Sequence, residues 1–309
     1  MSLKFTVLAS GSQGNASLIQ AGDFGVLIDC GISPRNLSVR LEQAALSWQH
    51  IHALILTHTH GDHWKERTLF RALKKAIPLY CHPGHHAPLT SSLAFTELKA
   101  AGLVRSFYAR REFSLGPDLR CQALPIRHDS GATFGFRFES IARLDSRCSL
   151  AYLTDLGTWD SELAEAVANV DLLALEFNHD VEMERTSGRG TYLIKRVLGD
   201  RGHLSNAQAI AFVKAVLRRS VPGKLQRLVQ LHLSDECNCP ILASEVTRKA
   251  LAELACDAEL FTASQHEVSP VFHLQASAIP TFARARSLRR SIRNNSDRFQ
   301  PCLPGFDID

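Results

Sequence analysis

The hexapeptide at residues 58–63, His-Thr-His-Gly-Asp-His, constrains this chain more than any other part of its sequence. Four of its six side chains are metal ligands, because neutral imidazole and carboxylate both bind zinc, manganese and iron. An apolar run precedes it and predicts a strand. His58 and His60 share one face of an extended segment, and Asp62 and His63 fall on the turn that follows. The hexapeptide therefore predicts a metal centre at a strand end, with room for two adjacent ions.

One loop does not supply enough ligands for such a centre, because a single ion takes three or four and a pair takes more. Three further apolar, strand-like runs lead into a candidate ligand, namely His128, Asp155 and His232. Sheets with helical connections place their sites beyond the carboxyl ends of strands. We therefore expect these three side chains to converge on residues 58–63.

Strand and helix patterns follow one another along the chain. Short apolar runs and glycine-rich turns predict three strands within residues 5–29, and Pro34 in a first turn predicts the start of a helix. More strands are expected within 104–153, and helices at 160–168 and 205–219. Two halves that each contain strands and then helices fit an α/β fold, a four-layer αββα sandwich.

The seven candidate ligands on this fold resemble those of the metallo-β-lactamase superfamily, in which a His-x-His-x-Asp-His motif precedes a later His, Asp and His. Within it, the chain resembles the YycJ/WalJ-like branch. The stretches that carry the resemblance are residues 9–15, 27–31, 153–157, 176–180, 202–206 and 232–234. We accordingly expect one hydrolase domain over residues 1–275, followed by a basic tail at 276–309.

The resemblance implies a centre with two divalent metal ions, zinc in first place and manganese or iron as alternatives. The implied ligands are His58, His60 and His128 for one ion, Asp62, His63 and His232 for the other, and Asp155 as a bridge. A hydroxide bridging the ions would attack phosphorus in line. Asp62 is expected to be essential for turnover.

His203 is the candidate for assisting the leaving group, as in related phosphodiesterases; the alternative is a loop histidine with a local hydrogen bond. Ser205 and Asn206 follow it at the predicted start of a helix, where a cap and free N–H groups would favour an anion. These two residues and His179 are candidates for substrate binding.

The glycine-rich loop at residues 10–15 is a further candidate for substrate binding, through Ser10, Ser12 and Asn15, because its glycines allow close approach to a ligand. A plain hairpin turn is the equal alternative. Asp29 follows an apolar strand and is expected to orient the metal loop by accepting a hydrogen bond.

The ligands alone fit hydrolysis of β-lactams, thioesters or phosphodiesters. The Gly-His-Leu-Ser-Asn turn at 202–206 favours a phosphodiester, and the YycJ/WalJ-like resemblance implies DNA and 5′-to-3′ exonuclease action. A small cyclic phosphodiester is the alternative candidate for the substrate. A third hypothesis for the function is a non-catalytic, metal-stabilised phosphate-binding protein.

Composition agrees with a soluble globular enzyme, since 45% of the 309 residues are hydrophobic and 21% are charged. We expect no membrane span, because no apolar run approaches the ~20 residues required. The eight cysteines lack the spacing of a disulfide framework, which favours the cytoplasm. The oligomeric state is left open.

Positive charge is concentrated at the end of the sequence. From residue 276 onward, six Arg against three Asp give +3, so the other 275 residues carry +1 of the total +4. Electrostatic binding of nucleic acid must therefore come from local positive patches, the metal ions or the tail. Truncation after Gln275 is predicted to weaken nucleic-acid binding; a solvated tail without such a role is the alternative.

Overall fold

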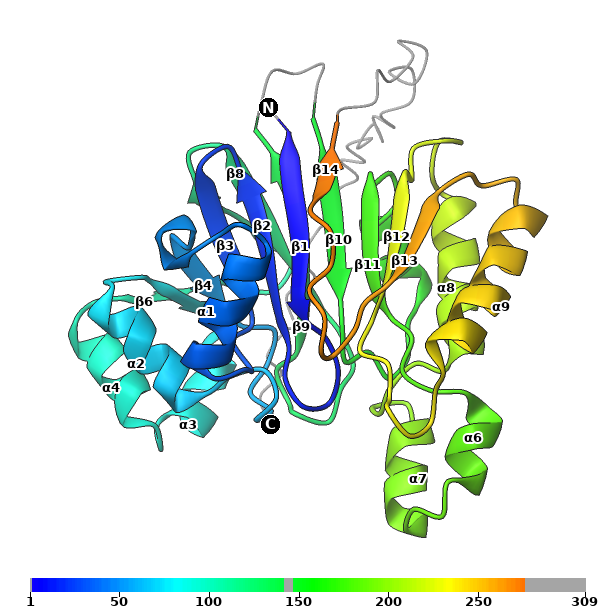
Figure 1. Ribbon diagram of the computed structural model, residues 1–309, viewed down its shortest axis with the longest axis horizontal. Coiled ribbons are helices and arrows are strands. Elements are labelled where there is room, and N and C mark those ends of the chain that lie inside the picture. Colours follow the sequence, from blue (N-terminus) through cyan, green and yellow to red (C-terminus); the bar gives the residue numbers. More distant parts are fainter. Residues whose placement is uncertain (1, 142–146, 276–309) are drawn as a thin grey trace, which may run out of the picture. The chain divides into compact units, whose positions relative to one another are not determined.

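The computed structural model describes residues 2–141 and 147–275, and two mixed sheets form its centre (Figure 1). The strands of the first sheet are β1 (Leu3–Ala9), β2 (Ala16–Ala21), β3 (Phe24–Ile28), β4 (Ala53–Ile55), β5 (Leu79–Cys81), β6 (Val104–Ser106) and β14 (Phe272–Leu274). Those of the second are β7 (Glu112–Gly116), β8 (Leu119–Pro125), β9 (Phe134–Ser140), β10 (Ser149–Leu153), β11 (Leu172–Glu176), β12 (Arg227–Leu231) and β13 (Glu259–Thr262). The strand orders are β14-β1-β2-β3-β4-β5-β6 and β13-β12-β11-β10-β9-β8-β7.

Helices cover the outer face of each sheet (Figure 1). The first sheet is covered by α1 (Pro34–Gln43), α2 (Glu66–Lys74), α3 (His86–Leu89) and α4 (Leu93–Ala100), and the second by α5 (Ser161–Ala166), α8 (Asn206–Leu217) and α9 (Pro240–Glu253). Two short helices, α6 (Val181–Thr186) and α7 (Thr191–Leu198), lie beyond one end of the sheets. This arrangement confirms the αββα sandwich.

Three apolar cores hold the four layers together. The core between the sheets is rich in aromatic rings, and Phe5 of β1 meets Tyr152 of β10 edge to face at 6.3 Å. A second core joins α1, α2 and α4 to the first sheet, and a third joins α5, α8 and α9 to the second. Burial of apolar surface on both faces of each sheet is what fixes the strand ends relative to one another.

The local expectations are largely confirmed. The three N-terminal strands and the helix beginning at Pro34 are present, and Ser33 caps that helix by accepting a 3.2 Å hydrogen bond from the Asn36 N–H. Helices α6 and α7 were not predicted. The predicted basic tail lies outside the described residues. No helix in residues 2–141 or 147–275 has both the length and the apolar character to cross a membrane.

The sheet topology gathers the functional strand ends at one edge. Strands β10, β11 and β12 are parallel, and β8 points the same way because it and β10 are both antiparallel to β9. Their carboxyl ends therefore lie at the same edge of the second sheet. In the first sheet β3 and β4 are also parallel.

Candidate metal centre and active site

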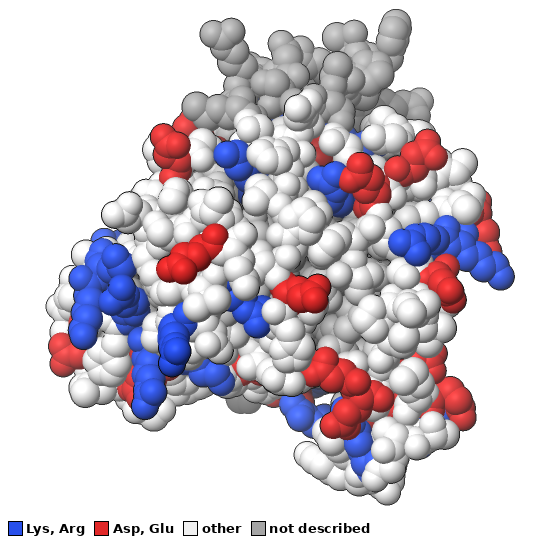
Figure 2. Space-filling model, in the orientation of Figure 1, with Lys and Arg blue, Asp and Glu red and all other residues white. Residues whose placement is uncertain are grey.

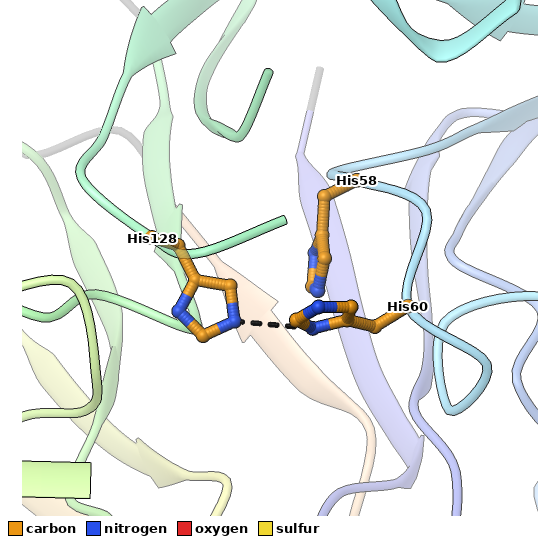
Figure 3. Close-up of side chains that lie close together, drawn as sticks. All are labelled: His58, His60 and His128. Carbon is orange, nitrogen blue, oxygen red and sulfur yellow. Dashed lines mark hydrogen bonds between the residues drawn. The ribbon is translucent and has the colours of Figure 1, made fainter. Parts of the chain in front are cut away.

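Three histidines from two sheets form the first group of candidate ligands. His58 and His60 follow β4, His128 follows β8, and their rings point toward one another (Figure 3). Nδ1 of His60 lies 3.2 Å from Nε2 of His128. Nε2 of His58 is buried and has no hydrogen-bond partner. Buried polar atoms are rarely left unpaired, so three nitrogens aimed at one point fit a divalent cation.

The protonation states of these rings agree with that fit. Nδ1 of His128 donates to the Gly202 carbonyl at 2.9 Å, which leaves the lone pair of Nε2 facing His60. Burial, with a smaller contribution from His63, lowers the pKa of His58 well below its ordinary value. Both histidines are therefore held in the neutral form that binds a metal.

The second group combines Asp62, His63, Asp155 and His232. Nε2 of His63 lies 3.0 Å from Asp155 Oδ2 and 3.3 Å from Asp62 Oδ2. Nε2 of His232 lies 3.5 Å from Asp62 Oδ2 and 3.8 Å from Asp155 Oδ1. Asp155 Oδ1 is also 3.7 Å from Nε2 of His128, so Asp155 faces both groups.

Asp29 orients the metal loop as expected. Nδ1 of His63 donates to Asp29 Oδ2 at 2.7 Å, and the Thr57 N–H donates to Oδ1 at 2.9 Å. Burial alone would lower the pKa of His63, but the carboxylates of Asp155 and Asp29 raise it well above its ordinary value. The pocket thus stabilises positive charge, as a cation site must.

The backbone is left-handed at three of these positions, with φ of 59° at Asp29, 54° at Asp155 and 54° at His232. Residues other than glycine adopt this conformation at a cost, and Asp and His do so more readily than most. Each of the three follows a strand directly or by one residue, so the turn that ends the strand is what aims the side chain.

Glu176 belongs to the site, although the sequence did not assign it a role. It is the last residue of β11 and is fully buried. Its Oε1 accepts from Nδ1 of His203 at 2.7 Å and from Nδ1 of His232 at 3.0 Å, and its Oε2 accepts from the Leu156 and Leu204 N–H groups at 3.0 Å. The signal that could have found it is its place at a strand end beside those of Asp155 and His232.

His203 lies beside the second group. Its ring stacks on the His232 ring with centroids 5.2 Å apart, and its Nδ1 donates a hydrogen bond to Glu176. Burial alone would lower the pKa of His203, but the Glu176 carboxylate raises it. Nε2 is the nitrogen left to meet a substrate.

A cavity of about 370 Å³ opens over the metal groups. Among its lining residues are His60, Asp62, Asp155, His203, His232, Ser12, Arg189 and Arg196. The two arginines come from the unpredicted α6–α7 segment. Arg196 forms a two-point ion pair with Asp129, whose Oδ1 lies 3.4 Å from His128 Nε2.

The glycine-rich loop contributes one side chain to this cavity, Ser12. Ser10 is buried, and its hydroxyl accepts from the His232 N–H at 2.8 Å. Asn15 is also buried, with Nδ2 at 3.3 Å from Asp62 Oδ2 and 3.1 Å from His63 Nε2. Ser10 and Asn15 thus lie behind the candidate ligands and position them.

The other three predicted substrate-binding residues do not reach the cavity surface. Ser205 caps α8 by accepting from the Gln208 N–H, as the sequence indicated, and Asn206 donates to Asn238 at 3.0 Å. His179 is fully buried, and neither ring nitrogen has a hydrogen-bond partner. The side chains of Ser205 and Asn206 thus hold the start of α8, the helix that follows His203.

Known proteins provide an independent comparison. Residues 25–222 match the family model described as "Beta-lactamase superfamily domain". The chain is 28% identical over 277 residues to "Exodeoxyribonuclease WalJ" of Streptococcus pneumoniae, covering 87% of this chain and 97% of that protein. It is 27% identical over 263 residues to "Exodeoxyribonuclease YycJ" of Bacillus anthracis, covering 82% and 90%.

A solved structure supports the fold. The metallo-beta-lactamase fold protein YhfI from Bacillus subtilis superimposes with a TM-score of 0.59 at 19% identity, over 87% of this chain and 99% of that one. At this identity the likeness concerns the arrangement of sheets and helices.

Proposed function

Because the chain belongs to the β-lactamase superfamily, as a YycJ/WalJ-like metal-dependent hydrolase, we propose that it is a DNA exonuclease acting from 5′ to 3′. The observation that carries the choice of DNA is the similarity, over 87% of the chain, to a protein named as an exodeoxyribonuclease. The polarity is proposed on the YycJ/WalJ-like resemblance.

The proposed centre holds two divalent ions, zinc first and manganese or iron as alternatives. One ion would be held by His58, His60 and His128, the other by Asp62, His63 and His232, with Asp155 shared between them. The orphaned Nε2 of His58 and the position of Asp155 between both groups support this division. When bound, such ions supply a hydroxide nucleophile at neutral pH and neutralise charge on the phosphate.

The remaining side chains position the reaction. Asp29 and Glu176 fix the rings of His63 and His232 by accepting from their Nδ1 atoms, so that each Nε2 points into the centre. Glu176 also holds His203 with Nε2 free, where that atom can donate a proton to the leaving oxygen.

A small phosphodiester is the second candidate substrate. The cavity of about 370 Å³ is at the lower end of the range for small-molecule sites, so it suits one small nucleotide as well as the end of a strand. A cyclic mononucleotide therefore belongs in the same assay as DNA.

The test uses single- and double-stranded DNA labelled at either end, with bis-p-nitrophenyl phosphate as a generic phosphodiester. We expect a 5′ label to be released first as a short product while a 3′ label stays in long fragments. Asp62→Asn should abolish this activity, and the exposed Asp257→Asn is the matched control. Cleavage of the small diesters without shortening of DNA would reject the exonuclease in favour of the second candidate.

A further inference from the structure

Four cationic side chains gather in a groove between α1 and α2, away from the catalytic cavity. The groove has a volume of about 360 Å³ and is lined by Arg35, Arg67, Arg71 and Lys74 with Pro34, Ser38 and Phe70. Figure 2 shows Lys and Arg side chains gathered over this part of the surface. We call this surface the α1–α2 groove.

The sequence of α2 builds one wall of the groove. Arg67, Arg71 and Lys74 are spaced i, i+4 and i+7, which places them on one face of the helix. The opposite face, including Leu69 and Ala72, is buried against the first sheet. The cations are therefore held on the outer side of a well-packed helix.

The charge in the groove is not compensated by acidic neighbours. Within residues 2–141 and 147–275, none of the four cations forms an ion pair, and Arg71 lies over the Trp48 ring at 5.9 Å. Glu66, the acidic residue of α2, is turned away, because its Oε1 accepts from Ser92 Oγ at 3.0 Å and from the Leu93 N–H at 2.8 Å. Like charges four apart repel, so this arrangement favours an anionic ligand.

Helix α2, which forms one wall of the groove, begins shortly after the metal loop. Only Trp64 and Lys65 separate the candidate ligand His63 from the first residue of α2. The segment before α1 is tied to the metal loop, since the Cys30 N–H donates to the His63 carbonyl, and to α2, since Thr68 Oγ1 donates to the Ile32 carbonyl, both at 2.8 Å.

We propose that the α1–α2 groove binds the phosphate backbone of the DNA strand whose end occupies the catalytic cavity. Residues 67 to 74 rise by about 10 Å along the helix, and the phosphates of one strand rise by about 3.4 Å along the axis of a DNA duplex. A duplex lying along α2 would thus present about three phosphate steps to this wall. Residues 1–275 carry a net charge of only +1, so their overall charge attracts DNA weakly. Binding of a polyanion to this part of the chain therefore depends on a local cluster of cations such as this one. The inference rests on the proposed function.

The test removes two groove cations, Arg67→Gln with Lys74→Gln, from the full chain loaded with metal. Arg71 is retained because it packs on Trp48. The matched control removes an exposed Arg and Lys from α9, Arg248→Gln with Lys249→Gln. Binding of a labelled phosphorothioate oligonucleotide, which resists hydrolysis, is followed by fluorescence anisotropy over a salt series.

We expect the groove variant to bind roughly tenfold or more weakly near 0.1 M salt, and its salt slope to fall by about 1.4 to 1.8. The control variant should match the wild type, and turnover of bis-p-nitrophenyl phosphate should be unchanged in both. Equal binding by the two variants would overturn the inference. A wild type that binds the oligonucleotide but does not shorten ordinary DNA would reject the proposed function and leave the groove standing.

Discussion

Glu176 holds His203 through a 2.7 Å hydrogen bond from the ring Nδ1 to carboxylate Oε1. The same oxygen accepts from Nδ1 of His232 at 3.0 Å, so one buried carboxylate fixes both a candidate ligand and the candidate proton donor. Burial alone would raise the pKa of Glu176, but the neighbouring His203 and His232 lower it to about 2. The carboxylate is therefore charged throughout the neutral range.

Replacement of Glu176 by Gln is predicted to lower kcat by about 10–100-fold, the usual cost of removing a partner that orients a metal ligand. The amide can still accept a hydrogen bond, but it no longer balances positive charge on either ring. Metal content and kcat measured on the same preparation check this result. Glu182→Gln, an exposed residue of α6, is the control. Unaltered kcat in E176Q would contradict the role given to Glu176.

Replacement of His203 by Ala should slow the cleavage of DNA while leaving the metal content intact, because Nδ1 of this ring is taken by Glu176 and Nε2 faces the cavity. A general acid contributes about 10²–10⁴-fold when the leaving alkoxide needs a proton. The loss should be much smaller for bis-p-nitrophenyl phosphate, whose leaving group departs as a stable anion. Equal losses on both substrates would argue against proton donation, and loss of metal would make His203 a ligand.

The candidate ligands were within reach of sequence reasoning because they obey local rules. Each lies in a segment that directly follows an apolar strand, and parallel strands bring such segments to one edge. The αββα layers follow from the same alternation of strands and helices. What a strand-end rule does not distinguish is whether a side chain faces the cavity or supports its neighbours.

Ser205 and Asn15 illustrate that limit. Both lie in segments that approach the site, yet Ser205 is used to cap α8 and Asn15 is buried against Asp62 and His63. Glu176 was overlooked for the converse reason, since a Glu at the end of an apolar run has no partner visible in the sequence. Arg196 depends on α7, a two-turn helix whose position is set by tertiary packing.

Replacement of Asp155 by Asn should abolish turnover and reduce the content of both ions, since this carboxylate faces His63 at 3.0 Å and His128 at 3.7 Å. Asn is chosen because, like Asp, it tolerates the left-handed backbone found here. Asp62→Asn should reduce the content of one ion only. Elemental analysis with circular dichroism as a check on folding tests both variants. Retention of two ions by D155N would exclude a bridging role.

Removal of divalent ions with a chelator is predicted to lower the melting temperature as well as abolish hydrolysis. Asp29, Asp155 and Glu176 are at most 2% exposed, and the ion pairs that they form within the described residues are with histidines. A bound cation would therefore lower the cost of burying these carboxylates together. Rebinding at 100 times the dissociation constant should stabilise the fold by about 2.7 kcal/mol per independent site. Differential scanning fluorimetry across a zinc titration measures the shift. His58→Asn should reduce the zinc-induced shift in melting temperature. Nε2 of His58 has no hydrogen-bond partner in the part of the chain that the structure describes, so a smaller shift would reflect the loss of a metal ligand. A melting temperature that responds to neither chelator nor zinc would mean that these side chains do not form a metal site.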